Sequence, residues 1–225
     1  MLKINKEILS FKDIPSMMEN SGRSILLIRH SYRESLKNGN IDPGLTAEGW
    51  DYAVECGRFL KGIKEVCFGA SPRKRTLQTV QGLMEGGELG DSTSTLTAYP
   101  QLYETALFSS PEALDISLEN NTLPRLLKTF FTTGSAPTMV GMKEFAEKLA
   151  DFLTGTEFEK KNVILASHDI ILMTLLLHYE VYAFHEEDWC GYVQGAFLHQ
   201  DMEGNWTLSY TVPDKENRKK HRLFV

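Results

Sequence analysis

The chain has 225 residues, enough for one large α/β domain or for one domain with a modest insertion. Hydrophobic residues make up 42% and charged residues 24%, a globular composition that excludes a fibrous or wholly disordered chain. The formal net charge is −6. It argues against a nucleic-acid or anionic-lipid partner, because both select a broad excess of lysine and arginine. Any anion-binding site must therefore be local.

The cysteines and apolar segments indicate the compartment. Cys56, Cys67 and Cys190 are odd in number and lack the spacing of a disulfide framework or of a CxxC pair. Residues 1–23 contain no uninterrupted apolar segment of the kind that a signal peptide needs. The most apolar run, residues 170–177, is too short to cross a bilayer. We therefore expect a cytoplasmic protein with no membrane partner.

Three short apolar runs, residues 24–28, 66–70 and 163–166, predict the central strands. Their apolar residues are continuous rather than alternating, which is typical of strands that helices cover on both faces. Residues 195–198 and 206–212, separated by Glu203-Gly204-Asn205, predict a hairpin that adds antiparallel edge strands. The sequence thus predicts a three-layer α/β sandwich with a mostly parallel, mixed sheet.

Helix signals lie between these strands. Thr46 is expected to cap one helix, and Ser71 a second with Pro72 at its first position. An amphipathic pattern from Met142 to Phe152 predicts a third, and the apolar segment 169–177 a buried fourth. Prolines and glycines between about residues 105 and 138 indicate an irregular helical insertion or lid within a single domain that spans residues 1–225.

Polar residues follow the predicted central strands directly: Arg29 and His30, Ser71 with Arg73 and Arg75, and His168 with Asp169. Because ligands bind beyond the carboxyl ends of strands in open α/β sheets, we expect these side chains to converge. Arginine forks make paired, charge-assisted hydrogen bonds to phosphate oxygens. Nearby cations should keep His30 neutral, and a neutral imidazole can accept a phosphoryl group. The pattern therefore predicts a phosphoryl-transfer site.

Five motifs in one order carry a family resemblance: Leu27-Ile28-Arg29-His30, Leu45-Thr46 with Gly49, Ser71-Pro72 with Arg75 and Gln78-Thr79, Leu102-Tyr103-Glu104, and Ala166-Ser167-His168. Together they resemble the histidine phosphatase superfamily, also called phosphoglycerate-mutase-like. The resemblance implies that His30 becomes phosphohistidine and that Arg29, Arg75 and His168 bind the phosphoryl group. Ser31 stands beside the nucleophile where the family usually has glycine, and we expect it to contact the substrate.

The proton donor stays open at this point, because the chain resembles two branches of the family. Arg33 and the pair His168-Asp169 resemble the acid-phosphatase branch, in which an aspartate is the donor. Leu102-Tyr103-Glu104 resembles the mutase-like branch, in which a glutamate is. The spacing favours Glu104 over Asp169.

Three basic residues lie close in sequence to the nucleophile or to Arg75. Arg33 is expected either to contact the phosphate or to pair with an acid such as Glu34 at the surface. Arg73 and Lys74 are expected to be solvated charges on a helix face. A basic run at residues 215–222 predicts a solvated tail.

The function expected from the sequence is hydrolysis of a small phosphomonoester through phosphohistidine, with neither metal nor cofactor. The alternatives are phosphoryl transfer of the phosphoglycerate-mutase type and a non-catalytic module that binds a phosphate ligand. The residues of the insertion follow no chemical pattern, so the sequence predicts neither the substrate nor the oligomeric state.

Overall fold

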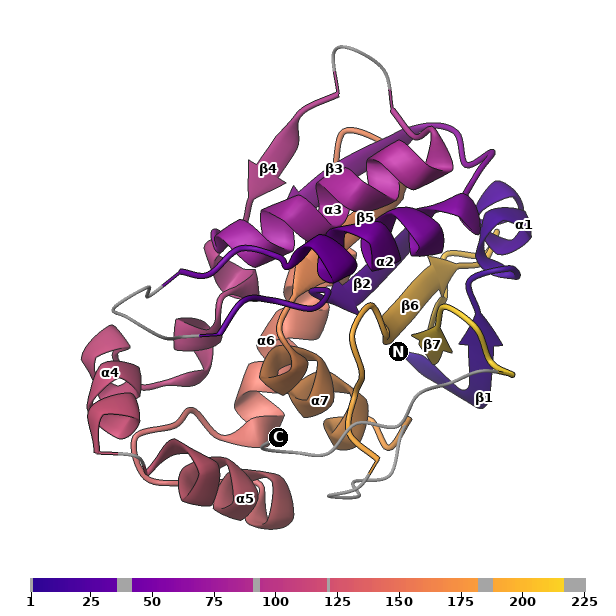
Figure 1. Cartoon of the computed structure of the whole chain (residues 1–225). Coiled ribbons are helices and arrows are strands. Elements are labelled where there is room, and N and C mark those ends of the chain that lie inside the picture. The colour runs from indigo at the N-terminus through magenta and orange to yellow at the C-terminus, as the bar shows by residue number, and fades with distance from the viewer. Residues whose placement is uncertain (1, 36–41, 91–93, 121, 182–187, 217–225) are drawn as a thin grey trace.

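A computed structural model describes residues 2–35, 42–90, 94–120, 122–181 and 188–216. Its centre is a seven-stranded mixed sheet in the order β1-β7-β6-β2-β5-β3-β4 (Figure 1). The strands are β1 (Lys3–Ser10), β2 (Ser24–Arg29), β3 (Val66–Ala70), β4 (Leu96–Ala98), β5 (Asn162–Ser167), β6 (Gly195–Gln200) and β7 (Trp206–Val212). The three apolar runs are the three central parallel strands, as predicted.

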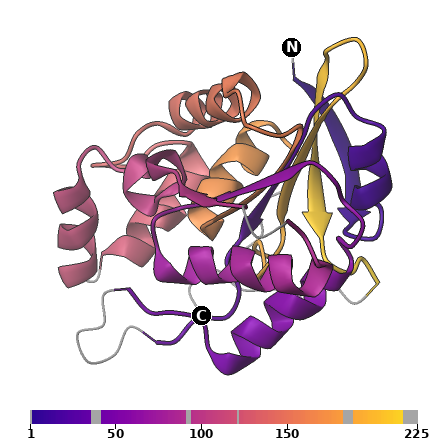
Figure 2. The same cartoon turned by 90° about the horizontal axis from the view of Figure 1, so that it is seen from above.

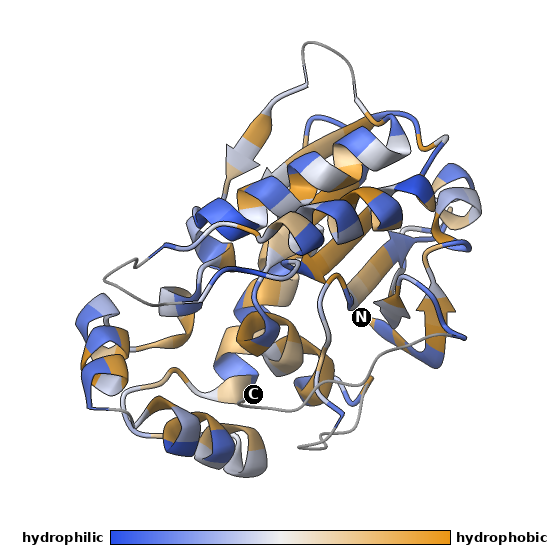
Figure 3. Ribbon diagram, viewed as in Figure 1, coloured by the Kyte–Doolittle hydropathy of each residue, from blue (hydrophilic) through white to orange (hydrophobic). Residues whose placement is uncertain are grey.

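Side chains of the central strands alternate between two apolar layers. Ile25 and Leu27 of β2 belong to one buried cluster, whereas Leu26 and Ile28 belong to the other. A strand points successive side chains to opposite faces, so a continuous apolar run is the sequence of a strand covered on both sides. In Figure 3 the apolar colour accordingly concentrates in the strands of the sheet.

Helices cover both faces of the sheet (Figures 1 and 2). One layer contains α1 (Ile14–Glu19), α2 (Ala47–Arg58) and α3 (Lys74–Gly87), and the other contains α6 (Met142–Gly155) and α7 (Asp169–His178). The predicted three-layer α/β sandwich is confirmed. Helix α7 is buried nearly all round, as its composition predicted. Over the ranges that the structure describes, no helix combines the length and apolarity needed to span a bilayer.

The segment predicted as an insertion is largely helical. The short 3-10 helix η1 (Pro100–Leu102) precedes it, a second, η2 (Glu104–Leu107), lies at its start, and α4 (Pro111–Glu119) and α5 (Leu123–Thr133) follow. Helices α4 and α5 lie on the side of the molecule away from β1 and α1 (Figure 1). Leu127, Phe130 and Phe131 of α5 are buried in the core cluster of α6 and α7. The single domain and the role of this segment as a lid stay predictions.

Two local predictions were wrong. The hairpin β6–β7 does not form the sheet edge, because β1 pairs in parallel with β7 and lies outside it. Strand β1 is mostly half-buried or exposed and carries Lys3, Lys6 and Glu7. Such charges are typical of edge strands, and they hide the apolar signal that reveals a central strand.

The start of α3 also differs from its prediction. The helix begins at Lys74 rather than after Ser71, and the side chain of Ser71 contacts His168 and Thr76 instead of capping. The carboxylate of Asp42 accepts a hydrogen bond from the Lys74 amide at 3.1 Å. The Thr46 cap of α2 is confirmed, with its hydroxyl 3.0 Å from the Gly49 amide. Residues 217–222 of the basic run lie outside the described residues.

Gly49 supports a test of this packing. A Cβ at Gly49 would lie 2.0 Å from the backbone oxygen of Tyr32, which follows β2 and His30 in the chain. Because a backbone carbonyl cannot move aside cheaply, we expect Gly49→Ala to lower the free energy of unfolding by about 1–3 kcal/mol. Gly155→Ala is the control, since a Cβ there meets no atom within 4 Å. Urea unfolding that shows equal stability for both variants would contradict the packing described.

Candidate active site

The sheet itself brings the predicted site residues together. The ladder between β2 and β5 continues one residue past the strand, where the His30 amide donates to the Ser167 carbonyl at 3.0 Å. On the other side of β5, the Ser71 amide donates to the Ala166 carbonyl at 2.9 Å. His30, Ser71 and His168 therefore follow the carboxyl ends of three adjacent parallel strands, β2, β3 and β5. The imidazole centroids of His30 and His168 lie 5.5 Å apart.

His30 is held as a neutral imidazole with one free nitrogen. It is 4% exposed, and its Nδ1 lies 2.7 Å from the Ser31 carbonyl oxygen. A carbonyl only accepts, so Nδ1 carries the hydrogen and the lone pair is on Nε2. Burial, followed by the charges of Arg75 and Arg29, holds the pKa of His30 well below its usual 6.5. From the sequence, nearby cations alone were expected to keep His30 neutral, but desolvation is the larger cause of its lowered pKa.

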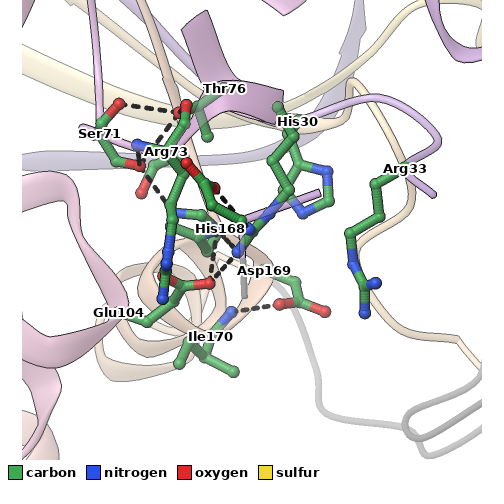
Figure 4. Close-up of polar contacts among 12 residues, drawn as sticks. His30, Arg33, Ser71, Arg73, Thr76, Glu104, His168, Asp169 and Ile170 are labelled. Atoms are coloured by element: carbon green, nitrogen blue, oxygen red, sulfur yellow. Dashed lines mark hydrogen bonds and ion pairs between the residues drawn. The ribbon is translucent and has the colours of Figure 1, made fainter. Parts of the chain in front are cut away.

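Glu104 and His168 lie beside His30 (Figure 4), and Arg75 contacts both of them to form a compact cluster. Oε1 of Glu104 contacts Nη2 of Arg75 and lies 3.0 Å from Nδ1 of His168. Nε2 of His168 lies 2.7 Å from the Ser71 hydroxyl. Nη2 of Arg75 lies 3.2 Å from the same Nδ1, so this nitrogen contacts both the carboxylate and the guanidinium. The Glu104 carboxylate thus contacts nitrogen atoms of Arg75 and His168 that could instead donate to a phosphate oxygen.

The pKa values of the cluster are shifted by burial. Burial raises the pKa of Glu104 above its usual value against the opposing charges of Arg75 and Arg73. Burial and the Arg75 charge hold the pKa of His168 well below 6.5. A raised pKa favours the protonated form of the carboxyl group, which is the form that a general acid needs.

Arg29 and Asp169 form the other side of the site. Nη2 of Arg29 lies 3.1 Å from Oδ2 of Asp169, and Nη1 donates to the Cys190 carbonyl at 2.7 Å. The guanidinium also lies over the ring of Tyr192, 4.3 Å from its centroid. Both candidate acids therefore lie at the site: Glu104 contacts Arg75, and Asp169 contacts Arg29.

The peripheral basic residues differ from one another. Arg33 is half-buried and donates to the backbone oxygen of Glu34 at 2.9 Å, yet its charge contributes to the lowered pKa of His30. Lys74 is exposed, as expected. Arg73 is not the solvated charge that the sequence suggested, because its side chain is 21% exposed and lies 4.7 Å over the Tyr103 ring. It also reaches the Glu104 carboxylate at 3.5 Å.

Tyr192, Trp189 and Asp42 were not predicted as site residues, and Arg73 was predicted to be a solvated charge rather than a phosphate ligand. The error at Arg73 follows from the misplaced start of α3, since the N-cap residue of a helix at Lys74 lies at the mouth of the site. Trp189 and Tyr192 lie in irregular chain just before β6 and give no periodic signal. Their contacts depend on tertiary packing.

Unpartnered polar atoms remain at the site. Nε of Arg29, Nε of Arg75 and the hydroxyl of Ser31 are buried and have no hydrogen-bond partner among the residues described here. The Ser31 amide, in contrast, donates to Thr79 at 2.9 Å. A buried donor without an acceptor costs about 1–3 kcal/mol, so an oxyanion that bound both guanidinium groups would relieve it. In the described part of the chain, no group of His, Cys, Asp and Glu has the arrangement of a metal site.

Comparison with known proteins identifies the class. The sequence model of the histidine phosphatase superfamily (branch 1) matches residues 25–194, so the chain belongs to this superfamily. The match spans the strand that precedes His30, the Glu104 loop and His168. No curated protein matches the chain in sequence.

Solved structures share the fold at low identity. A phosphoglycerate mutase from Bacillus anthracis is 16% identical, with a TM-score of 0.58 over 87% of this chain and 95% of that one. A mycobacterial glucosyl-3-phosphoglycerate phosphatase is 17% identical, with a TM-score of 0.53 over 84% of this chain and 98% of that one. Both show a phosphoglycerate-mutase-like fold.

The protonation of His30 can be tested directly. Because burial and two guanidinium groups lower its pKa, we expect His30 to be neutral and Nδ1-protonated at pH 6. Long-range ¹H–¹⁵N correlation spectra of the imidazole report both properties. Arg75→Met should raise the pKa of His30, since it removes an opposing charge. A cationic His30 at pH 6, or an Nε2-protonated ring, would contradict the assignment.

Proposed function

We propose that the chain is a phosphatase that hydrolyses a small phosphomonoester through phosphohistidine on His30, without metal or cofactor. The observation that carries the proposal is the buried His30, neutral and with Nε2 unprotonated, beside the Arg75–Glu104–His168 cluster. A neutral imidazole next to fixed donors is suited to attack phosphorus, because phosphoryl transfer depends on positioning and on charge stabilisation.

In the first step, Nε2 of His30 attacks phosphorus and the bond to the leaving oxygen breaks. The electron pair of that bond passes to the leaving oxygen, which takes the proton of Glu104 and departs as an alcohol. Arg29, Arg75 and His168 donate to the three equatorial oxygens, where charge accumulates in the transition state. Arg33 adds a further cation at the edge of the site.

In the second step, a water molecule attacks the phosphohistidine. The Glu104 carboxylate takes a proton from the water as the new oxygen–phosphorus bond forms. The nitrogen–phosphorus bond breaks and its electron pair returns to Nε2 of His30. Inorganic phosphate leaves, and the site is again neutral at His30 and protonated at Glu104.

The charge balance of the site supports this role for Glu104. Among the residues that the structure describes, the guanidinium groups of Arg29, Arg33, Arg73 and Arg75 lie at the site with three carboxylates, those of Asp42, Glu104 and Asp169. With both histidines neutral, this leaves one excess positive charge. Protonation of Glu104 raises the excess to two, which matches a phosphate dianion. Arrival of substrate should therefore favour protonated Glu104.

The function is tested by following the fate of the phosphoryl group. We expect incubation with sugar phosphates, nucleotides, phosphorylated acids and phosphopeptides to release inorganic phosphate from at least one class. Transfer to an alcohol without net release would instead show a mutase, the alternative that the likeness to a mutase structure keeps open.

His30→Ala should reduce turnover by at least about 10³-fold, because it removes the nucleophile. His178→Ala, at the far end of α7, is the matched control and should leave turnover unchanged. Equal turnover of the His30→Ala variant and the unaltered protein would rule out the proposed nucleophile.

Glu104→Gln tests the proton donor through the leaving group. An alkoxide needs a proton to depart, whereas p-nitrophenolate does not. We expect Glu104→Gln to slow the first turnover of an alkyl phosphate by about 10²–10⁴-fold and that of p-nitrophenyl phosphate much less. Rapid-quench measurements of both substrates provide the comparison. A uniform loss would mean that Glu104 does not donate the proton.

The same variant should bind inorganic phosphate more tightly. In the free protein the Glu104 carboxylate contacts Arg75 and His168, which the phosphate needs. A neutral amide competes less for these donors, so we expect calorimetry at pH 8 to show about 3–10-fold tighter binding. Weaker binding by Glu104→Gln would contradict this competition.

A further inference from the structure

Three contacts restrain the side chain of Arg29. Its two terminal nitrogens contact the Cys190 carbonyl and the Asp169 carboxylate, and its face lies on Tyr192. Nε is left without a partner among the described residues. Three contacts thus fix the guanidinium, while its buried Nε still lacks an acceptor among the described residues.

Asp169 is itself held by hydrogen bonds. Oδ1 accepts from the Ile170 amide at 2.9 Å, at the first turn of α7. Oδ2, which faces Arg29, also accepts from the indole Nε1–H of Trp189 at 3.1 Å. Both oxygens are therefore directed at N–H groups, and a proton on Oδ2 would displace one of them. This arrangement suits a fixed carboxylate more than a group that exchanges protons with substrate.

The indole of Trp189 is held by packing. Trp189 is 1% exposed, and its ring meets that of Phe131 edge to face with the centroids 4.8 Å apart. Phe131 belongs to α5, so the insertion supports the far side of the indole. A buried indole N–H needs an acceptor, and here the acceptor is the carboxylate that contacts Arg29.

We propose that Trp189 and Asp169 are positioning residues for Arg29, with the indole N–H orienting the carboxylate and the carboxylate orienting the guanidinium toward the phosphoryl group. The proposal rests on the phosphate-binding role of Arg29 in the proposed function. It assigns to Asp169 a different task from that of its counterpart in the acid-phosphatase branch, where the aspartate donates the proton.

Binding of inorganic phosphate, measured by calorimetry, tests the proposal without need of turnover. Trp189→Phe keeps an aromatic ring against Phe131 and removes the N–H. We expect it to weaken phosphate binding by about 5–10-fold, the effect of one oriented hydrogen bond. Trp206→Phe is the matched control, because Trp206 lies in β7 over Arg23 and should bind phosphate normally. Unchanged affinity of Trp189→Phe would overturn the proposal.

A double-mutant cycle tests whether Trp189 acts through Asp169. In an Asp169→Ala background, Trp189→Phe should have no further effect on phosphate affinity, because the N–H has no carboxylate to orient. Independent, additive losses would overturn the proposed path. Trp189→His, which keeps a ring N–H, should recover part of the affinity that Trp189→Phe loses. Should Trp189→Phe fail to fold, Asp169→Asn replaces it, and a normal phosphate affinity of that variant overturns the proposal.

Leaving-group dependence separates positioning from proton donation. A positioning role predicts that Asp169→Asn slows the first turnover of alkyl and p-nitrophenyl phosphates by a similar factor. A selective loss for the alkyl substrate would make Asp169 a proton donor and overturn the proposal. If the unaltered protein hydrolyses no phosphomonoester, the proposed function fails, while the calorimetric comparison still decides whether Trp189 and Asp169 position Arg29.

Discussion

The site depends on burying two histidines beside guanidinium groups so that both imidazoles stay uncharged. Burial alone disfavours the imidazolium of His30 and His168, and the nearby arginines add to the effect. The ladder between β2 and β5 fixes the backbone of His30 one residue past the strand. A carbonyl acceptor then selects the tautomer that leaves Nε2 free. Sheet geometry and desolvation together thus produce a nucleophile at neutral pH.

Two carboxylates at this site differ because their surroundings differ. Glu104 is buried against Arg75 and His168, and burial raises its pKa. Asp169 lies at the start of α7, where an amide, an indole and Arg29 all direct N–H groups at it. The first environment favours a group that gains and loses a proton, whereas in the second three N–H groups hold the carboxylate in place. The sequence places both acids near the nucleophile but does not show this difference.

The sequence predicts the fold to the extent that local signals carry it. The apolar runs of β2, β3 and β5 define the central sheet. The polar residues that follow these runs place His30, Arg75 and His168 at the carboxyl ends of the strands. Strand β1 could not be predicted, because an edge strand with solvent-facing charges lacks an apolar pattern. Arg73 was predicted as a solvated charge on the helix face, but the helix begins only at Lys74 and the Arg73 guanidinium contacts Glu104 and the Tyr103 ring. Trp189 packs against Phe131 of α5, and such a tertiary contact leaves no signal in the local sequence.

The most direct test of the account is to find where the phosphoryl group resides between the two steps. The protein is mixed with a ³²P-labelled phosphomonoester, quenched in alkali within the first turnover, and digested for peptide mapping. The account predicts alkali-stable, acid-labile label on the peptide that contains His30, and none in His30→Ala. Label on another residue, or hydrolysis with no labelled protein at any time, would contradict it.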